Sequence, residues 1–367
     1  IDIGSYDVIL EIFEISKKQG IRSVDKICHR MELGKDTYTL GKIRPEMEEE
    51  LCRVLADFVR IMEGYRVDDY RATASSAISE ASNSLYVLGK IHQLTGFSVT
   101  VLSNSEQRFL SYKALAAMED NFNKIIEKGT AILDLDGGSF QISLFDKDAL
   151  VTTQNIRMGS LRIRERLAGI QSETEHYEEM VEELIWNEVS SFKKMYLKDR
   201  KIENIMLIGD VFTDSVYQNI EEKTTKIISR ENFNTWYEKI IRQSPMELAV
   251  KLGIPLENAS LMYPSAVIYK CLIDMMGAEH IWIPGVHMTR GIAYEYAEQM
   301  KLLKGGHNFE NDILVASRNI AKRYSTGKDH IKGTTDLALA IFDSMKKVHG
   351  MGDRERLLLQ IAVQLHD

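Results

Sequence analysis

Two segments that lie far apart in the chain share one pattern of hydrophobic and polar positions. Each has an apolar strand interrupted by aspartate, then a turn rich in glycine and serine, then a second apolar strand. An aspartate inside a buried strand is costly unless it meets a metal or a hydrogen-bond partner, and such a turn exposes backbone N–H groups that can hold phosphate. The repetition predicts two similar lobes that face each other across a phosphate-binding cleft. The segments are Ile1-Asp2-Ile3-Gly4-Ser5 and Ile132-Leu133-Asp134-Leu135-Asp136-Gly137-Gly138-Ser139.

The periodicity of apolar positions predicts a similar order of elements after each segment. Residues 1–15 are expected to form a β-hairpin that turns at 17–20, and residues 130–146 a second hairpin. A helix, a strand and another helix follow each hairpin, and the chain after residue 284 is expected to be almost wholly helical. Helices are predicted at 45–62, from 105, at 172–195 and across most of 230–275, and strands at 97–102 and 205–209.

This order of elements is typical of an α/β fold built from two duplicated lobes with a helical region after them. The natural boundaries lie where polar and glycine-containing stretches separate the periodic segments. We therefore expect a first lobe in residues 1–122, a second lobe in 123–305 and a helical domain in 306–367.

Charge and composition narrow the class of function. The chain of 367 residues has 46 basic and 54 acidic residues, a net charge of −8, which argues against nucleic acid as the main partner. An anionic substrate would need a local basic lining or a metal ion. No apolar run approaches the ~20 residues that cross a bilayer, so no membrane partner is expected. Three scattered cysteines predict reduced thiols and a cytoplasmic location.

Six segments in one order resemble the motifs of the exopolyphosphatase/guanosine-pentaphosphate phosphohydrolase (Ppx/GppA) family. The first is the initial segment, which is similar to the family's first phosphate loop. The others are Ala77-Ile78-Ser79-Glu80-Ala81-Ser82-Asn83 for SALREARN, Leu102-Ser103-Asn104-Ser105-Glu106-Gln107 for ISGxEE, Leu133–Gln141 for VDIGGGSTE, Gly159–Glu165 for GxVRLxE, and Leu365-His366-Asp367 for the start of an HD-type helical domain.

The resemblance implies a fold, an activity and partners. The fold is two ribonuclease H-like lobes of the actin-like ATPase/sugar-kinase kind around a cleft, followed by a helical, HD-type domain. The implied activity is the release of terminal phosphate from polyphosphate or a guanosine penta- or tetraphosphate, by in-line attack of water. A homodimer is expected because family members commonly pair through the helical part.

The motifs assign roles to individual residues. Asp2 and Asp134 are expected to hold Mg²⁺, because acids outnumber bases around the presumed site. The carboxylate positions that handle water are occupied by Gln107 and Gln141, with Glu106 beside the first. Phosphate is expected at Gly4, Ser5, Asp136, Gly137, Gly138 and Ser139, and the substrate is expected to be lined by Arg108, Arg162 and Arg290.

The sequence departs from the family pattern at the presumed site. Gln107 and Gln141 stand where the family has glutamate, Ser79 and Thr289 where it has arginine, and Asp136 is an additional acid in the turn, as is Asp7. Glutamine cannot accept a proton at neutral pH, but it can orient water. A general base typically adds about 10²–10⁴-fold to the rate. The substitutions therefore predict a slower enzyme and leave a binding protein without catalysis as an alternative.

Other interpretations stay open. A third hypothesis is an ATPase or kinase of the same fold, since the chain lacks a Walker-type motif but this fold binds ATP without one. Glu106 follows Ser103-Asn104-Ser105, so helix capping and catalysis are equally expected for it. Arg162 and Glu165 are spaced for an ion pair within a helix. His287 is expected to be a surface or core histidine.

Overall fold

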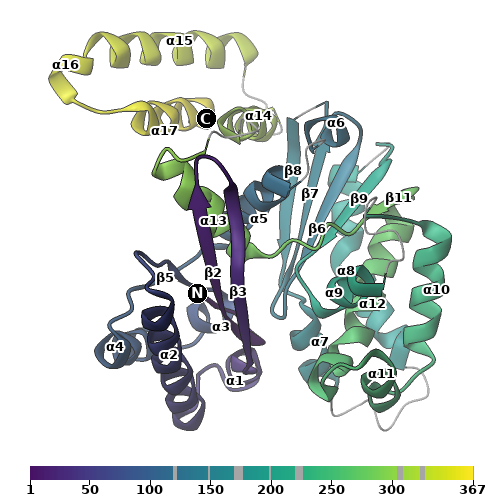
Figure 1. The fold of residues 1–367 in the computed structure, drawn as a ribbon. Helices are drawn as coiled ribbons and strands as arrows, with labels where there is room; N and C mark the ends of the chain where they lie inside the picture. Colours follow the sequence, from purple (N-terminus) through teal and green to yellow (C-terminus); the bar gives the residue numbers. More distant parts are fainter. Residues whose placement is uncertain are drawn as a thin grey trace.

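Two lobes and a helical region make up the chain, as seen in a computed structural model (Figure 1). No helix in the described part of the chain is long and apolar enough to span a bilayer. The residues described are 1–118, 122–147, 149–168, 177–197, 200–219, 226–303, 309–322 and 327–366.

The first lobe is a five-stranded sheet in the order β3-β2-β1-β4-β5. Its first three strands are antiparallel, and β4 and β5 continue the sheet in parallel with β1. The strands are β1 (Asp2–Ile3), β2 (Asp7–Ser16), β3 (Gly20–Arg30), β4 (Ala72–Ala74) and β5 (Val99–Val101), and the helices are α1 (Leu33–Leu40), α2 (Pro45–Tyr65), α3 (Ser76–Ser79) and α4 (Ser84–Thr95).

Helix α2 shows how the sequence builds this lobe. Pro45 occupies the first helical position, where its missing N–H is not needed. Leu51, Leu55 and Phe58 follow at helical spacing and are buried in the core beneath the sheet. Arg66 ends the helix in the left-handed conformation at φ 55°. The periodicity predicted this helix within three residues at its end.

The second lobe repeats the arrangement in a six-stranded sheet in the order β10-β11-β9-β6-β7-β8. Three antiparallel strands (β8, β7, β6) are again followed by parallel neighbours, β9 and β11. The strands are β6 (Thr130–Leu135), β7 (Phe140–Asp146), β8 (Ala149–Ile156), β9 (Asn204–Ile208), β10 (Ile227–Ser229) and β11 (His280–Trp282), and the helical elements are α6 (Phe122–Ile126), α7 (Ser160–Leu167), α8 (Tyr177–Phe192), the π-helix η1 (Lys193–Leu197), α9 (Val211–Asn219), α10 (Arg230–Ile241), α11 (Pro245–Leu252) and α12 (Leu256–Met276).

The shared topology confirms the duplicated lobes of the sequence-based prediction. The third strand of each lobe, β3 and β8, was not predicted. Both strands are largely exposed or half-buried, so neither has the apolar run that identified its neighbours.

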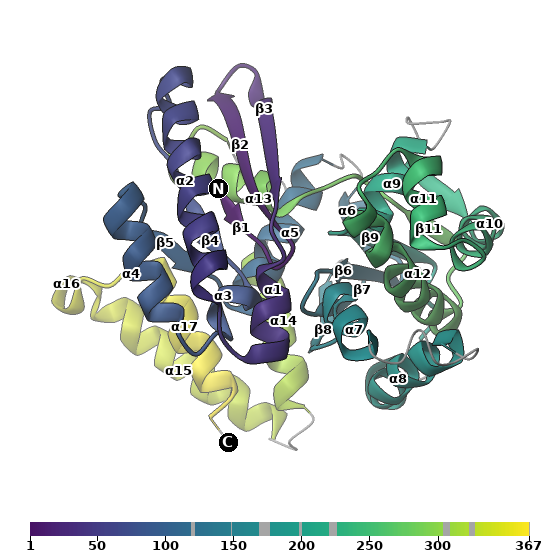
Figure 2. The ribbon, with the colours of Figure 1, turned by 90° about the horizontal axis from the view of Figure 1, so that it is seen from below.

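Two helices connect the lobes. α5 (Asn104–Met118) leaves the first lobe, and α13 (Met288–Gln299) returns from the second lobe to pack along α5 and against β2 and β3. The interval 123–305, predicted for the second lobe, thus includes a helix that covers the first. Figure 2 shows α5 and the segment leading into α13 between the lobes.

Helices follow α13, as predicted. α14 packs against β8, and α17 packs against α14 and α15. Asp367, assigned to an HD-type motif, lies outside the described residues, whereas His366 is described and its Nε2 lies 3.2 Å from Nε2 of His330. The elements are α14 (Phe309–Ala321), α15 (Lys328–Ser344), α16 (Lys346–His349) and α17 (Asp353–Gln364).

Candidate active site

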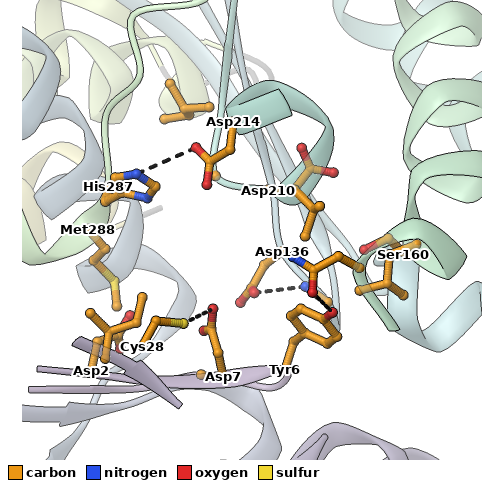
Figure 3. Close-up of a pocket in the computed structure, with 18 of the residues that line it drawn as sticks. Asp2, Tyr6, Asp7, Cys28, Asp136, Ser160, Asp210, Asp214, His287 and Met288 are labelled. Atoms are coloured by element: carbon orange, nitrogen blue, oxygen red, sulfur yellow. Dashed lines mark hydrogen bonds and ion pairs between the residues drawn. The ribbon is translucent and has the colours of Figure 1, made fainter. Parts of the chain in front are cut away.

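A cavity of about 450 Å³ lies between the two lobes (Figure 3). The two glycine-containing turns contribute Gly4 and Gly137 to its wall. Its lining is strongly acidic. Two basic side chains, Lys26 and Arg30, and one histidine, His287, face six aspartates in it. The aspartates are Asp2, Asp7, Asp134, Asp136, Asp210 and Asp214.

Asp2 and Asp134 occupy equivalent positions in the two lobes. Each lies on the first strand of its lobe, β1 or β6, and that strand lies inside the sheet rather than at its edge. Thr73 donates a long hydrogen bond of 3.4 Å to Asp2 Oδ1, and Ser111 Oγ donates one of 2.6 Å to Asp134 Oδ2. Burial raises the pKa of Asp2 to about 7 and the pKa of Asp134 to about 6. In each carboxylate the second oxygen has no hydrogen-bond partner among the described residues.

Asp7 and Asp136 bring two further carboxylates to the cavity from opposite lobes. Asp136 Oδ1 accepts a 2.7 Å hydrogen bond from the N–H of Gly137. Asp7 Oδ2 accepts one of 3.3 Å from the thiol of Cys28. Burial raises the pKa of both groups, that of Asp136 to about 6, and the repulsion between them raises the pKa of Asp136 further. These two acids, absent from the family pattern, increase the negative charge of the cavity.

The second turn also approaches the first lobe closely at Gly138, which does not line the cavity. A Cβ added to Gly138 would lie 2.1 Å from Tyr38 Oη and 2.5 Å from Ser76 Oγ, both on the opposite lobe. Tyr38 Oη is in turn 2.6 Å from Ser5 Oγ. Only glycine fits at position 138 because the lobes approach so closely there. Of the predicted phosphate-binding residues, Gly4, Asp136 and Gly137 line the cavity, whereas Ser5, Gly138 and Ser139 do not.

Both glutamines at the family's glutamate positions line the cavity. Gln107 is 7% exposed and Gln141 is 4% exposed. The Gln107 Nε2 and Gln141 Oε1 atoms are buried without a hydrogen-bond partner in the described part of the chain. An unpaired buried amide group is unfavourable, so these two side chains are poised to bind water or a ligand.

Glu106 caps α5. Its Oε2 accepts hydrogen bonds from Ser103 N at 2.8 Å and Ser103 Oγ at 2.7 Å, while its own N–H donates to Ser103 Oγ. This is a capping box, and these bonds lower the pKa of Glu106. Glu106 is exposed and is not among the residues that line the cavity.

The three arginines expected around the substrate do not line the cavity either. Arg108 is buried and donates to Thr153 and Ser105. Arg290 is half-buried, and its Nε has no hydrogen-bond partner within the described residues. The third, Arg162, contacts residues of the first lobe.

Arg162 joins the lobes. Its Nη2 donates to Glu80 Oε2 at 3.0 Å and its Nε to the carbonyl of Gly138 at 2.8 Å. Glu165 pairs with Arg164 at 2.6 Å, so the helical ion pair expected between Arg162 and Glu165 is not formed. The motif around Arg162 therefore supplies an interlobe contact.

Three titratable residues of the cavity, Asp210, Asp214 and His287, were not among the site residues assigned from the sequence. Asp210 and Asp214 lie at the carboxyl end of β9 and on α9, a position where open parallel sheets bind ligands. Gly209 precedes them at φ 105°, and a Cβ there would lie 2.6 Å from Asp134 Oδ1. His287, expected at the surface or in the core, lines the cavity instead.

The residues that the structure describes include no group of three or more His, Cys, Asp or Glu side chains able to hold a metal ion by themselves. The oxygen donors present nevertheless suit Mg²⁺, which usually binds one or two carboxylates and completes its shell with water and substrate phosphates. The unpartnered oxygens of Asp2 and Asp134 fit that role.

Comparisons with known proteins agree with this geometry. A family model described as the Ppx/GppA phosphatase family matches residues 12–300. The chain is 21% identical over 308 residues to a bifunctional 3-dehydroquinate synthase/phosphatase of Fusobacterium nucleatum, covering 77% of this chain and 44% of that protein. It is 25% identical over 144 residues to exopolyphosphatase 1 of Mycobacterium leprae, covering 39% and 41%. The chain thus spans less than half of these relatives.

Solved structures show the same fold. An exopolyphosphatase from Cytophaga hutchinsonii matches with a TM-score of 0.73 at 17% identity, over 82% of this chain and 97% of that one. The Aquifex aeolicus member of the Ppx/GppA family matches with a TM-score of 0.66 at 17% identity, with the same coverage. With its duplicated actin-like lobes, its paired turns and a family model that spans most of its length, the chain belongs to the Ppx/GppA phosphatase family.

Proposed function

We propose that the chain is a phosphohydrolase that releases terminal phosphate from polyphosphate or a guanosine penta- or tetraphosphate. The observation that carries this proposal is the cavity between the lobes, where Gly4 and Gly137 from the paired turns face buried carboxylates. The curated relatives named as an exopolyphosphatase and a phosphatase support the same class of reaction.

Different residues of the cavity have different roles in the proposed reaction. Successive phosphates bind along the wall of the cavity that Gly4 and Gly137 of the two turns form, and closure of the lobes excludes water other than the attacking molecule. The amides of Gln107 and Gln141 orient that water for in-line attack. Because phosphoryl transfer depends mainly on positioning and charge neutralisation, a site without glutamate at these positions can still be active.

Asp2 and Asp134 would hold Mg²⁺ in this proposal. When bound, the ion supplies positive charge that offsets the repulsion between the acidic lining and the phosphates. Burial already raises the pKa of both carboxyl groups, so a cation would favour their ionised forms. The cavity is lined by six aspartates and only two basic side chains, and this surplus of acidic groups motivates the assignment of Asp2 and Asp134 to Mg²⁺.

Phosphate release tests the proposal. The chain and its Gln107→Glu variant would be offered polyphosphate and pppGpp in parallel, with Mg²⁺ and with a chelator. We expect release by the unmodified chain and faster release by the variant, because a carboxylate can accept the proton that glutamine cannot. The better substrate identifies the specificity.

A binding protein without catalysis is the second candidate. Its support is the burial of two unpaired amide groups, Gln107 Nε2 and Gln141 Oε1, at the positions where the family has carboxylates. This function predicts tight binding of the same ligands, no phosphate release by the unmodified chain, and release once glutamate is restored at both positions.

The proposal includes a cytoplasmic homodimer. The free thiols of Cys28, Cys52 and Cys271 favour a reducing compartment. Exposed apolar side chains on successive turns of α15, Leu337 and Ile341, are 63% and 51% exposed and favour pairing through the helical region. Sedimentation equilibrium measures the oligomeric state directly.

A further inference from the structure

A histidine–aspartate pair that no family motif includes faces the cavity. His287 lies in the segment between β11 and α13, and Asp214 lies on α9 of the second lobe. Their Nε2 and Oδ1 atoms are 3.5 Å apart, and Figure 3 shows the pair in the wall of the cavity, on the far side from Ser160. The other ring nitrogen, Nδ1, has no hydrogen-bond partner in the described parts of the chain.

The charged groups around His287 come from three elements. Besides Asp214 on α9, they are Lys26 on β3 and Glu11 and Asp7 on β2. Burial has the largest effect and lowers the pKa of His287, while the carboxylates oppose that change and Lys26 adds to it. The imidazole is therefore neutral at neutral pH and free to accept a proton.

The backbone that carries His287 is anchored by the helix that follows it. The next helix begins directly after it, and Thr289 in the first turn of that helix donates a hydrogen bond to Glu11. This bond ties the segment carrying His287 to β2, the strand that also carries Asp7. The ring is thus held between the lobes rather than on a free loop.

Gln107 and Gln141 stand where the family has glutamate, so neither of these two positions offers a side chain that can accept a proton. Resting on the function proposed above, we propose that His287 is the general base, that it accepts the proton of the attacking water, and that Asp214 positions its ring. The water oxygen forms a bond to the terminal phosphorus while the bridging P–O bond breaks, and the leaving phosphate chain departs with that electron pair. The proton resides on the imidazolium, paired with Asp214, and then returns to solvent.

Kinetics of three variants test this role. His287→Asn is expected to lower kcat about 10²–10⁴-fold, the usual contribution of a general base, with little change in KM. The wild-type rate should rise with pH as the imidazole loses its proton, at a pH below the ordinary histidine pKa of about 6.5. That acidic limb should be absent in His287→Asn.

Asp214→Asn separates positioning from catalysis. Loss of its negative charge lowers the pKa of His287, so the acidic limb should move to lower pH while kcat falls, and Asp214→Glu should recover part of the rate. The matched control is His29→Asn. His29 pairs with Glu50 at 3.2 Å and does not line the cavity, so its replacement should leave kcat and the pH profile unchanged.

Two results would overturn the assignment. One is a His287→Asn variant that keeps kcat near the wild-type value. The other is a variant that loses kcat yet keeps the acidic limb, while circular dichroism and the binding of inorganic phosphate show an intact fold and cavity. If the wild-type chain releases no phosphate from any substrate, both the proposed function and the role of His287 fail. If the wild-type chain is active and His287→Asn is equally active, only the role of His287 fails.

Discussion

The guanidinium of Arg162 stacks on the ring of Tyr38 across the two lobes, with its Cζ 3.8 Å from the ring centroid. The same side chain binds the carboxylate of Glu80 and the carbonyl of Gly138. One arginine of α7 therefore holds the first lobe through a cation–π contact and a hydrogen-bonded ion pair, beside the cavity but outside it.

Arg162→Gln should loosen the contact between the lobes. Loss of the stacking and of the bond to Glu80 is expected to reduce the free energy of unfolding by about 2 kcal/mol and to increase the radius of gyration in solution. Urea unfolding and small-angle X-ray scattering measure the two effects. Arg242→Gln is the matched control, because Arg242 is exposed and pairs within its own helix. Equal behaviour of the two variants would exclude Arg162 as an interlobe contact.

Glu106 should matter for stability and not for the chemical step. Glu106→Ala removes the two bonds that the Glu106 carboxylate accepts from Ser103 and is expected to cost about 1 kcal/mol of unfolding free energy, whereas Glu106→Gln keeps the capping box and should be nearly neutral. Neither should change kcat by more than a small factor. Thermal unfolding and phosphate release check both statements. A large loss of kcat in Glu106→Gln would instead mark a catalytic carboxylate.

Stability should fall as pH rises through the acidic range. Burial raises the pKa of Asp210 to about 7 in the folded chain, whereas an unfolded aspartate titrates near about 3.9. The folded state therefore holds this proton more tightly, and its contribution to stability is full below about pH 4 and lost as pH rises to about 7. Asp210→Asn should flatten that slope in urea unfolding, and Asp57→Asn, at an exposed site, should not. An unchanged slope would contradict the prediction.

Mg²⁺ should stabilise the fold above pH 7. Binding to the native state alone adds about 2.7 kcal/mol when the ion is at a hundredfold excess over its Kd, and Asp134→Asn should lose most of this gain. Differential scanning calorimetry at constant ionic strength measures the shift in Tm. Asp69→Asn is the control, because Asp69 pairs with Arg71 at 3.1 Å away from the cavity. An equal shift in both variants would remove Asp134 from the metal site.

The sequence could predict those features that depend on residues close together in the chain. Asp2, Asp134 and Gly137 stand next to apolar strands and within motifs, so the duplicated lobes and the floor of the cavity followed from the residues around them. Glu106 could not be assigned, because capping and catalysis need the same residue at the start of a helix. Only the positions of the atoms of Ser103 distinguish the two roles.

The rest depends on contacts between distant parts of the chain. Asp214 and His287 carry no shared local signal, and they meet because the segments that carry them follow β9 and β11, which are parallel neighbours in the sheet. Arg162 sits in a family motif, yet its partners Tyr38 and Glu80 belong to the opposite lobe, so its spacing to Glu165 suggested a different pair. Long-range packing decided each of these cases over the local pattern.

The hydrogen bond from Thr289 to Glu11 joins residues 278 positions apart, which bears on how the protein is made. A ribosome produces β2 and β3 long before α13, the helix that packs against them, which emerges only after both lobes have been translated. At a typical elongation rate of about 5–20 residues per second, that face of the nascent sheet stays uncovered for many seconds. Chaperones that recognise exposed apolar strands have their opportunity in that interval.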